Sequence, residues 1–246
     1  MRLHASDIHT YYGASHVLQG ASLVVEPSEV VALLGRNGAG KTTMMRSIIG
    51  LTRPDSGSIL LDGEELLGSP SYRPARLGLA YLPSGRRVFS SLSVAQNLEV
   101  ARRSCARRSG SWNIERVYEL FPKLAQLSRR TAGHLSGGEQ QMLKIGRALM
   151  TNPAMILLDE PTEGLSPAVV DELGEWLSML AGENLSILLA EQSATFAREH
   201  ASRGYLLEKG TIRFEGTMDE IWDSAELRSA LGIAARVEGT TDGQAG

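Results

Sequence analysis

The sequence predicts an α/β fold with a mixed-sheet core, an antiparallel β subdomain and a helical subdomain. Three observations predict it. Apolar runs typical of strands alternate with segments of helical spacing, a glycine-rich phosphate-binding motif lies between one such run and a helix, and Ser93–Ala132 has helical character. A chain of 246 residues is also long enough to bury a sizeable core.

The composition is that of an ordinary globular protein, with 42% hydrophobic residues, 22% charged residues and a formal net charge of −3. This charge gives no indication of a nucleic-acid partner. Cys105 is the only cysteine, which favours a reducing compartment such as the cytoplasm. No apolar run approaches the ~20 residues of a membrane helix, and the first residues lack a signal-peptide pattern. We therefore expect any membrane contact to be made through a partner.

The first third of the chain has the pattern of strands. They are expected over Leu18–Val25, over Val30–Gly35, and on both sides of Asp62-Gly63, a dipeptide typical of hairpin turns. The first helix is expected only after Gly40.

The segment Ser93–Ala132 is expected to be helical, with Ser93 as its N-cap. Apolar residues of its second half follow helical spacing: Trp112, Ile114, Val117, Leu120 and Phe121. An arginine-rich stretch lies between the two helical halves of this segment and favours a solvated loop or helix end. It contains Arg102, Arg103, Arg107 and Arg108.

The second half alternates helices and buried strands. A helix after Ser136 should end before Pro153, and the run "AMILLDE" is the next strand. Another helix should begin at Ser166-Pro167 and end near Gly182, followed by the buried strand "SILLAEQ". A hairpin is expected around Lys209-Gly210.

These elements predict one domain over residues 1–236, with a disordered tail over 237–246. Within the domain, residues 1–92 and 134–236 form the core with its β subdomain, and residues 93–133 form the helical subdomain.

The segment "GRNGAGKTT" matches the phosphate-loop pattern G-x-x-x-x-G-K-[ST], between an apolar strand and a helix. Its glycines let the backbone wrap around phosphates, Lys41 offers positive charge to the β- and γ-phosphates, and Thr42 offers a hydroxyl to Mg²⁺. The expected ATP-binding residues of this loop are Gly35, Arg36, Asn37, Gly38, Ala39, Gly40, Lys41, Thr42 and Thr43.

A phosphate loop needs a second group on the magnesium side, and the strand "AMILLDE" provides two carboxylates at its end. Asp159 would hold the metal, and Glu160 would polarise a water molecule for attack on the γ-phosphate. The alternative interpretation is a buried strand that ends in two surface acids.

A second anion site is expected at "LSGGEQQ", where Ser136 and two glycines precede a strong helical pattern. The free backbone N–H groups of such a helix start bind anions. The chain would then have two anion-binding sites for one ATP-sized ligand, and these sites are far apart in the sequence.

Together these residues resemble the ATP-binding subunits of ABC transporters, over nearly the whole chain. The resemblance implies a P-loop NTPase fold of ABC type with a RecA-like core, the cofactors ATP and Mg²⁺, and a head-to-tail dimer. In that dimer each ATP lies between the phosphate loop of one chain and the segment Leu135–Glu139 of the other, which is called the signature segment below. This arrangement explains why one chain has two anion sites. The residues implied to bind ATP in trans are Leu135, Ser136, Gly137, Gly138 and Glu139.

The resemblance also assigns roles at two isolated positions. Tyr12 matches the aromatic residue that stacks on adenine, and stacking is favoured over the alternative that this tyrosine before a turn only serves packing. Gln192 stands where most of these ATPases have a switch histidine. Glutamine can donate a hydrogen bond to the γ-phosphate but cannot titrate, so a role as a polar sensor remains. Lys41, Glu160 and Gln192 are the implied catalytic residues.

Four other positions concern signalling between the subunits, at Ser166, or coupling to a permease. Ser166 stands where many relatives have aspartate, and Ser84 where they have glutamate or glutamine. Serine is too short to link the metal site to the permease, so Ser84 is a weak candidate for a metal ligand and coupling there would rely on water. Arg86 and Arg87 are either part of a permease-facing surface or a solvated basic pair.

Gln192 and the segments "PSGRRVFSSLSVAQNL", "VYELFP" and "GGEQQMLKIGRALMTNP" resemble the second ATPase subunit of high-affinity importers of branched-chain amino acids and amides. The implied function is ATP hydrolysis that powers such import. The implied location is peripheral, on the cytoplasmic face of the cell membrane. The implied partners are an identical or paralogous ATPase, two membrane permease subunits and, indirectly, a solute-binding protein.

Two alternatives remain open. The chain could be a nucleotide-gated regulatory dimer with weak hydrolysis, which Ser84, Ser166 and Gln192 favour, whereas Glu160 disfavours it. It could also be a soluble ABC ATPase that acts on DNA or ribosomes, which the single cassette, the short helical insert and the acidic net charge disfavour. The transported substrate is not encoded in an ATPase subunit, and import rather than export follows from the resemblance alone.

Overall fold

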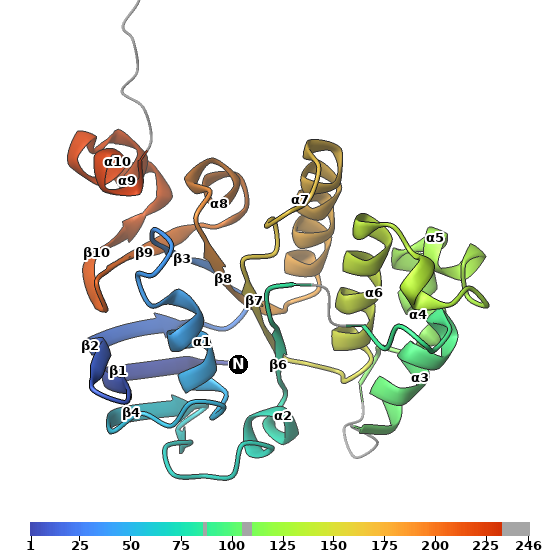
Figure 1. The fold of residues 1–246 in the computed structure, drawn as a ribbon, viewed down its shortest axis with the longest axis horizontal. Helices are drawn as coiled ribbons and strands as arrows, with labels where there is room; N and C mark the ends of the chain where they lie inside the picture. The colour runs from blue at the N-terminus through green and yellow to red at the C-terminus, as the bar shows by residue number, and fades with distance from the viewer. Residues whose placement is uncertain (86–87, 105–109, 233–246) are drawn as a thin grey trace, which may run out of the picture.

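A computed structural model describes residues 1–85, 88–104 and 110–232. At its centre is a six-stranded sheet with the strand order β10-β9-β3-β8-β7-β6 (Figure 1). The neighbours from β9 to β6 run parallel and β10 is antiparallel to β9, which confirms the expected mixed sheet. The strands are β3 (Val30–Leu34), β6 (Leu79–Leu82), β7 (Met155–Asp159), β8 (Ser186–Glu191), β9 (Arg203–Glu208) and β10 (Thr211–Thr217).

The central strands β3, β7 and β8 are buried along their whole length. This explains why they read as continuous apolar runs in the sequence. Successive residues contact opposite faces: Val31 and Leu33 pack towards a second sheet, whereas Ala32 and Leu34 pack towards the helices. The sheet is therefore the middle of three layers.

The second sheet is antiparallel, with the order β2-β1-β4-β5, and confirms the expected β subdomain. Its strands are β1 (Leu3–Tyr12), β2 (Ser15–Val25), β4 (Ser56–Leu61) and β5 (Glu64–Glu65). Asp62 and Gly63 form the turn between β4 and β5 with φ of 49° and 84°, as their dipeptide predicts.

Strand β1 was not predicted, because register shifts between Ala5 and Ile8 and beyond Ile8 break the two-residue alternation of its apolar side chains. Asp7 lies within this irregular stretch with a positive φ of 51°.

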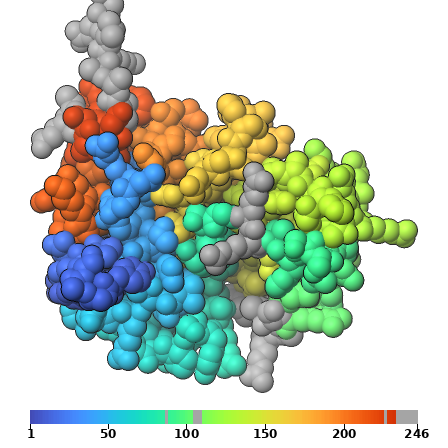
Figure 2. Space-filling model, viewed as in Figure 1, coloured from blue at the N-terminus to red at the C-terminus, as the bar shows by residue number. Residues whose placement is uncertain are grey.

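Helix α1 (Lys41–Ile48) packs between the two sheets and contributes Met44, Met45 and Ile48 to the core that they share. It begins directly after Gly40, as expected. Most of the remaining helices cover the other face of the central sheet, whereas Leu77 of the short helix α2 (Arg73–Leu77) packs on the α1 side. Figure 2 shows the β subdomain and the helical segment at opposite ends of the visible surface.

The segment expected to be helical contains α3 (Val94–Ser104), α4 (Ile114–Leu120) and α5 (Pro122–Gln126). The Ser93 hydroxyl accepts a hydrogen bond from the Gln96 backbone N–H at 3.2 Å and caps α3 as predicted. Arg102 and Arg103 lie in the last turn of α3, where both pair with Glu99. Arg107 and Arg108 lie outside the described residues.

Helix α6 (Gly137–Leu149) packs on α3 and α5 as well as on β6 (Figure 1). It thus contacts both sides of the boundary expected at residue 134, and the division into subdomains there stays a prediction. The side chains of α3, α4 and α6 share one apolar core with the central sheet.

The C-terminal elements follow the sequence patterns. Helix α7 (Pro167–Gly182) begins after its N-cap Ser166, and Lys209-Gly210 forms the turn between β9 and β10. The other elements are α2 (Arg73–Leu77), the 3₁₀ turn Ala132–His134, α8 (Ala194–His200), α9 (Met218–Asp223) and α10 (Ala225–Leu231). No helix within the described ranges is both long and apolar enough to cross a membrane. The tail 237–246 lies outside those ranges, so its disorder stays a prediction.

Candidate functional site

The phosphate loop connects the C-terminal end of β3 to α1 and takes its shape from its glycines. Gly38 and Gly40 have positive φ angles of 81° and 114°, which side chains disfavour. A Cβ atom on Gly35 would lie 2.5 Å from the Leu207 carbonyl oxygen, so this position has no room for a side chain. Because the loop ends at the start of α1, the first N–H groups of that helix are available to an anion.

Lys41 is the buried cation of this loop, with 3% of its surface exposed. Its Nζ donates to the Gly35 carbonyl oxygen at 2.7 Å and lies 2.9 Å from Glu160 Oε1. The lysine and the glutamate, which sequence analysis assigns to phosphate binding and to water activation, thus form an ion pair with each other. Phosphate that binds Lys41 would compete with this pair.

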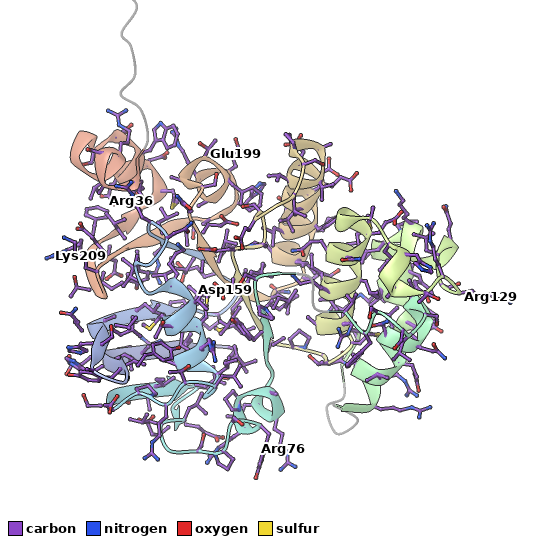
Figure 3. The ribbon with its side chains drawn as sticks, in the orientation of Figure 1. Arg36, Arg76, Arg129, Asp159, Glu199 and Lys209 are labelled. Atoms are coloured by element: carbon purple, nitrogen blue, oxygen red, sulfur yellow. The ribbon has the colours of Figure 1, made fainter. Side chains whose placement is uncertain are left out.

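Thr42 and Asp159 meet although they lie far apart in the sequence. The Thr42 hydroxyl donates to Asp159 Oδ1 at 3.0 Å, and the Tyr81 hydroxyl donates to Asp159 Oδ2 at 2.9 Å. Burial raises the pKa of Asp159 above its usual range, and the two hydrogen bonds act against this rise. Figure 3 labels Asp159 in the centre of the molecule. Hydroxyl and carboxylate oxygens are ligands that suit Mg²⁺, so these residues fit the expected metal.

Glu160 follows the last residue of β7 and has a positive φ of 47°. Its backbone N–H donates to the Ala190 carbonyl oxygen of β8 at 2.9 Å, which holds the residue in this uncommon conformation. The side chain is directed to Lys41. Strain of this kind at the end of a parallel strand is typical of a functional position.

Glu191 is a buried acid that sequence analysis missed. Its carboxylate accepts hydrogen bonds from the backbone N–H groups of Thr162 and Gln192, both at 3.1 Å. Burial raises the pKa of this carboxyl. Glu191 therefore links the loop after Glu160 to the start of the segment that carries the exposed Gln192. Only its position at the end of a strand beside β7 could have indicated this role.

Tyr12 lies at the end of β1 with 46% of its surface exposed. Its hydroxyl group is 3.1 Å from Thr52 Oγ1, in the loop that follows α1. The ring therefore has free surface near the phosphate-loop helix, and adenine stacking stays a prediction.

The signature segment caps its own helix. Ser136 Oγ accepts from the Glu139 N–H at 3.3 Å, and the Ser136 N–H donates to the Glu139 carboxylate at 2.8 Å. This second bond keeps the pKa of Glu139 below its ordinary value. Leu135 is buried, and a Cβ atom on Gly138 would lie 2.9 Å from Val169.

Helices α1 and α6, whose N-terminal ends are the two expected anion sites, lie on opposite sides of β6 and β7 (Figure 1). Binding in trans stays a prediction.

The loop after β6 carries the positions expected to concern coupling. Ser84 is half-buried in the bend after β6, and Arg86 and Arg87 lie outside the described residues.

Comparison with known proteins decides the family. Residues 18–163 match the family model described as "ABC transporter". The chain belongs to the ABC transporter family. This ABC ATPase is 41% identical to the high-affinity branched-chain amino acid transport ATP-binding protein BraG of Pseudomonas aeruginosa, over 91% of its own length and 96% of that protein. It is 36% identical to the lipopolysaccharide export system ATP-binding protein LptB of Acidithiobacillus ferridurans, over 92% and 94%.

Solved structures agree with this assignment. The ABC ATPase is 28% identical to a structure of an ATP-binding subunit of an ABC transporter, with a TM-score of 0.79 over 94% of its own length and 95% of that chain. The expected ABC-type fold is confirmed, and as a member of this family the chain is an ATP-binding subunit of a transporter that hydrolyses ATP.

Proposed function

We propose that the chain powers import of branched-chain amino acids, or of related polar amino acids or amides. It would act on the cytoplasmic face of the membrane, with a second identical or paralogous ATPase and two permease subunits. A solute-binding protein would select the cargo. The observation that supports import is the similarity to BraG over nearly the full length of both chains. The cluster of Lys41, Asp159 and Glu160 supports hydrolysis.

In the proposed reaction, Lys41 and the N–H groups of the phosphate loop neutralise the negative charge of the transferred phosphoryl group. Glu160 accepts a proton from the attacking water. Thr42 and Asp159 would hold Mg²⁺, which would supply Lewis-acid polarisation of the phosphate oxygens when bound. Gln192 donates a hydrogen bond to the γ-phosphate, and Ser136 with its glycines binds that group from the other subunit.

The ion pair between Lys41 and Glu160 gives this mechanism a defined first step. When phosphate binds Lys41, the pair opens and frees the Glu160 carboxylate to contact water. The two groups thus neutralise each other until nucleotide arrives.

Neither alternative receives comparable support. A regulatory dimer with weak hydrolysis does not account for the carboxylate of Glu160 beside Lys41. Action on DNA or ribosomes has no counterpart in the names of BraG and LptB, which are both transport proteins. The similarity to LptB shows that the ATPase subunit alone leaves the direction of transport open.

Co-purification from the native cell tests the proposed function. The tagged chain, extracted from membranes in mild detergent, should carry two permease chains and an ATPase partner. A strain without the chain should lose high-affinity uptake of radiolabelled leucine, isoleucine or valine. Recovery with export components and normal uptake would contradict import, and recovery only with ribosomes or DNA would contradict a transport role.

Tyr81 should support the metal site through Asp159. Tyr81→Phe removes the hydroxyl that donates to Asp159 Oδ2. This hydrogen bond fixes the orientation of the carboxyl group and favours its ionised form, so its loss should weaken metal binding. We expect the Mg²⁺ concentration for half-maximal ATP hydrolysis to rise about tenfold, with little change at saturating Mg²⁺. Tyr72→Phe, at an exposed tyrosine, is the matched control. An unchanged Mg²⁺ requirement would contradict the role of Tyr81.

A further inference from the structure

Helix α6 carries a buried cation, Lys144, next to the reacting centre. Only 9% of its surface is exposed. Its Nζ donates to the Gly85 carbonyl oxygen at 2.9 Å and to Gln141 Oε1 at 3.0 Å. Both acceptors are neutral, and burial lowers the pKa of Lys144 to about 8 against the attraction of Asp159. A buried ammonium group with neutral partners costs folding free energy, so stability alone does not explain this residue.

The hydrogen bonds of Lys144 and Gln141 join three segments near the reacting centre: the loop after β6, helix α6 and the loop after β7. Gly85 belongs to the loop after β6, the strand that carries Tyr81. Gln141 Nε2 in turn donates to the Pro161 carbonyl oxygen at 3.3 Å, and Pro161 directly follows Glu160. Lys144 and Gln141 therefore connect the loop after β6, through α6, to the loop that carries Glu160.

A small cavity of about 30 Å³ lies between these groups, and its lining includes Gly85, Gln141, Lys144 and Glu160. Its lining is part polar and part apolar, and its volume has room for one water molecule. Lys144 also borders a larger groove of about 400 Å³, whose lining includes Tyr81 and Pro83. Lys144 thus lies between the larger groove and the small cavity that Glu160 also lines.

Ser84 cannot make this connection, because its side chain is short and the loop reaches α6 through a backbone oxygen instead. In the structure, two side chains of α6, Lys144 and Gln141, together join this loop to the loop that carries Glu160.

We propose that Lys144 is a positioning residue for ATP hydrolysis. Through its hydrogen bond to Gln141, it holds the loop after β6 and the loop after β7 at a fixed distance. The Glu160 carboxylate then faces the reacting water once phosphate has bound Lys41. The proposal rests on the proposed role of Glu160 as the base. A group that acts through orientation affects turnover and leaves nucleotide affinity nearly intact.

Lys144→Met tests the proposal, because it removes the charge and the hydrogen bonds but keeps an unbranched side chain of similar length. Measured on the complete purified chain, we expect kcat for ATP to fall about tenfold, with the Kd for ATP within about twofold of wild type. Lys144→Arg should recover most of kcat, since the groove leaves space for the larger group.

Arg147→Met is the matched control. Arg147 is a half-buried cation one turn further along α6 and borders the same groove, with its guanidinium over the Phe89 ring. Its loss should leave kcat nearly unchanged. Equal losses in Lys144→Met and Arg147→Met, wild-type turnover in Lys144→Met, or a lowered ATP affinity at unchanged kcat would each overturn the proposal.

If Lys144→Met does not fold, by circular dichroism and thermal unfolding, Gln141→Leu removes the next link to Pro161 and should lower kcat in the same way. Normal turnover in Gln141→Leu would then overturn the proposal. Absence of hydrolysis by the wild-type chain with all its partners would instead refute the underlying ATPase assignment.

Discussion

Glu160→Gln is expected to reduce steady-state ATP hydrolysis by a factor on the order of 10² to 10⁴, the usual contribution of a general base. Glutamine has the shape of glutamate, but its amide cannot accept the proton of the attacking water at neutral pH. ATP should still bind, because the phosphate loop and Lys41 are unchanged. Rates of phosphate release and ATP titrations measure the two effects separately.

The ion pair with Lys41 sharpens this expectation. In the structure Glu160 Oε1 lies 2.9 Å from Lys41 Nζ, so wild-type protein must break this pair when ATP binds. The glutamine variant has no such pair, and its affinity for ATP should be equal to or higher than that of wild type. Brisk hydrolysis, or a marked loss of ATP affinity, would contradict the assignment. Glu172→Gln, at an exposed position on α7, is the control.

The phosphate loop could be predicted from the sequence because its information is local. A buried strand, a run of glycines and a helix follow one another from β3 to α1, and each imposes its own conformation. The turns at Asp62-Gly63 and Lys209-Gly210 were predicted for the same reason, since a positive φ at adjacent residues selects few residue types.

The supporting contacts could not be predicted, because they join residues that only the fold brings together. Tyr81 reaches Asp159 from a neighbouring strand, and Lys144 reaches Gly85 from a helix 59 residues further on. Neither residue belongs to a local pattern that differs from ordinary packing. Glu191 is similar: a strand that ends in an acid does not reveal that the acid binds the backbone of the next loop.

Replacement of Lys41 by alanine should have a comparably large effect, but on binding. Lys41 is 3% exposed and already donates within the phosphate loop, so its ammonium group is held in place before nucleotide arrives. Hydrogen bonds to charged groups contribute about 1.5–3 kcal/mol, which corresponds to a loss of about 10- to 100-fold in ATP affinity. Calorimetric titration with ATP measures this loss.

Lys41→Arg is the control for charge alone. The guanidinium group is planar and bulkier than an ammonium group, and the loop around the buried Lys41 offers little free space. We therefore expect this variant to remain weak. Full affinity in Lys41→Arg would show that charge suffices and that the geometry of the loop does not select lysine.

The Lys41→Ala variant also tests whether each site is built from two chains. Ser136→Asp keeps an effective N-cap for α6 but places a carboxylate where the γ-phosphate is proposed to bind. Analytical ultracentrifugation with ATP would first establish that the chain pairs with itself. In a dimer of one Lys41→Ala chain and one Ser136→Asp chain, one site is intact only if its phosphate loop and signature segment come from different chains. We therefore expect the mixture to hydrolyse ATP faster than either variant alone. If both parts came from one chain, every site would carry a defect and the mixture would stay as slow as its components.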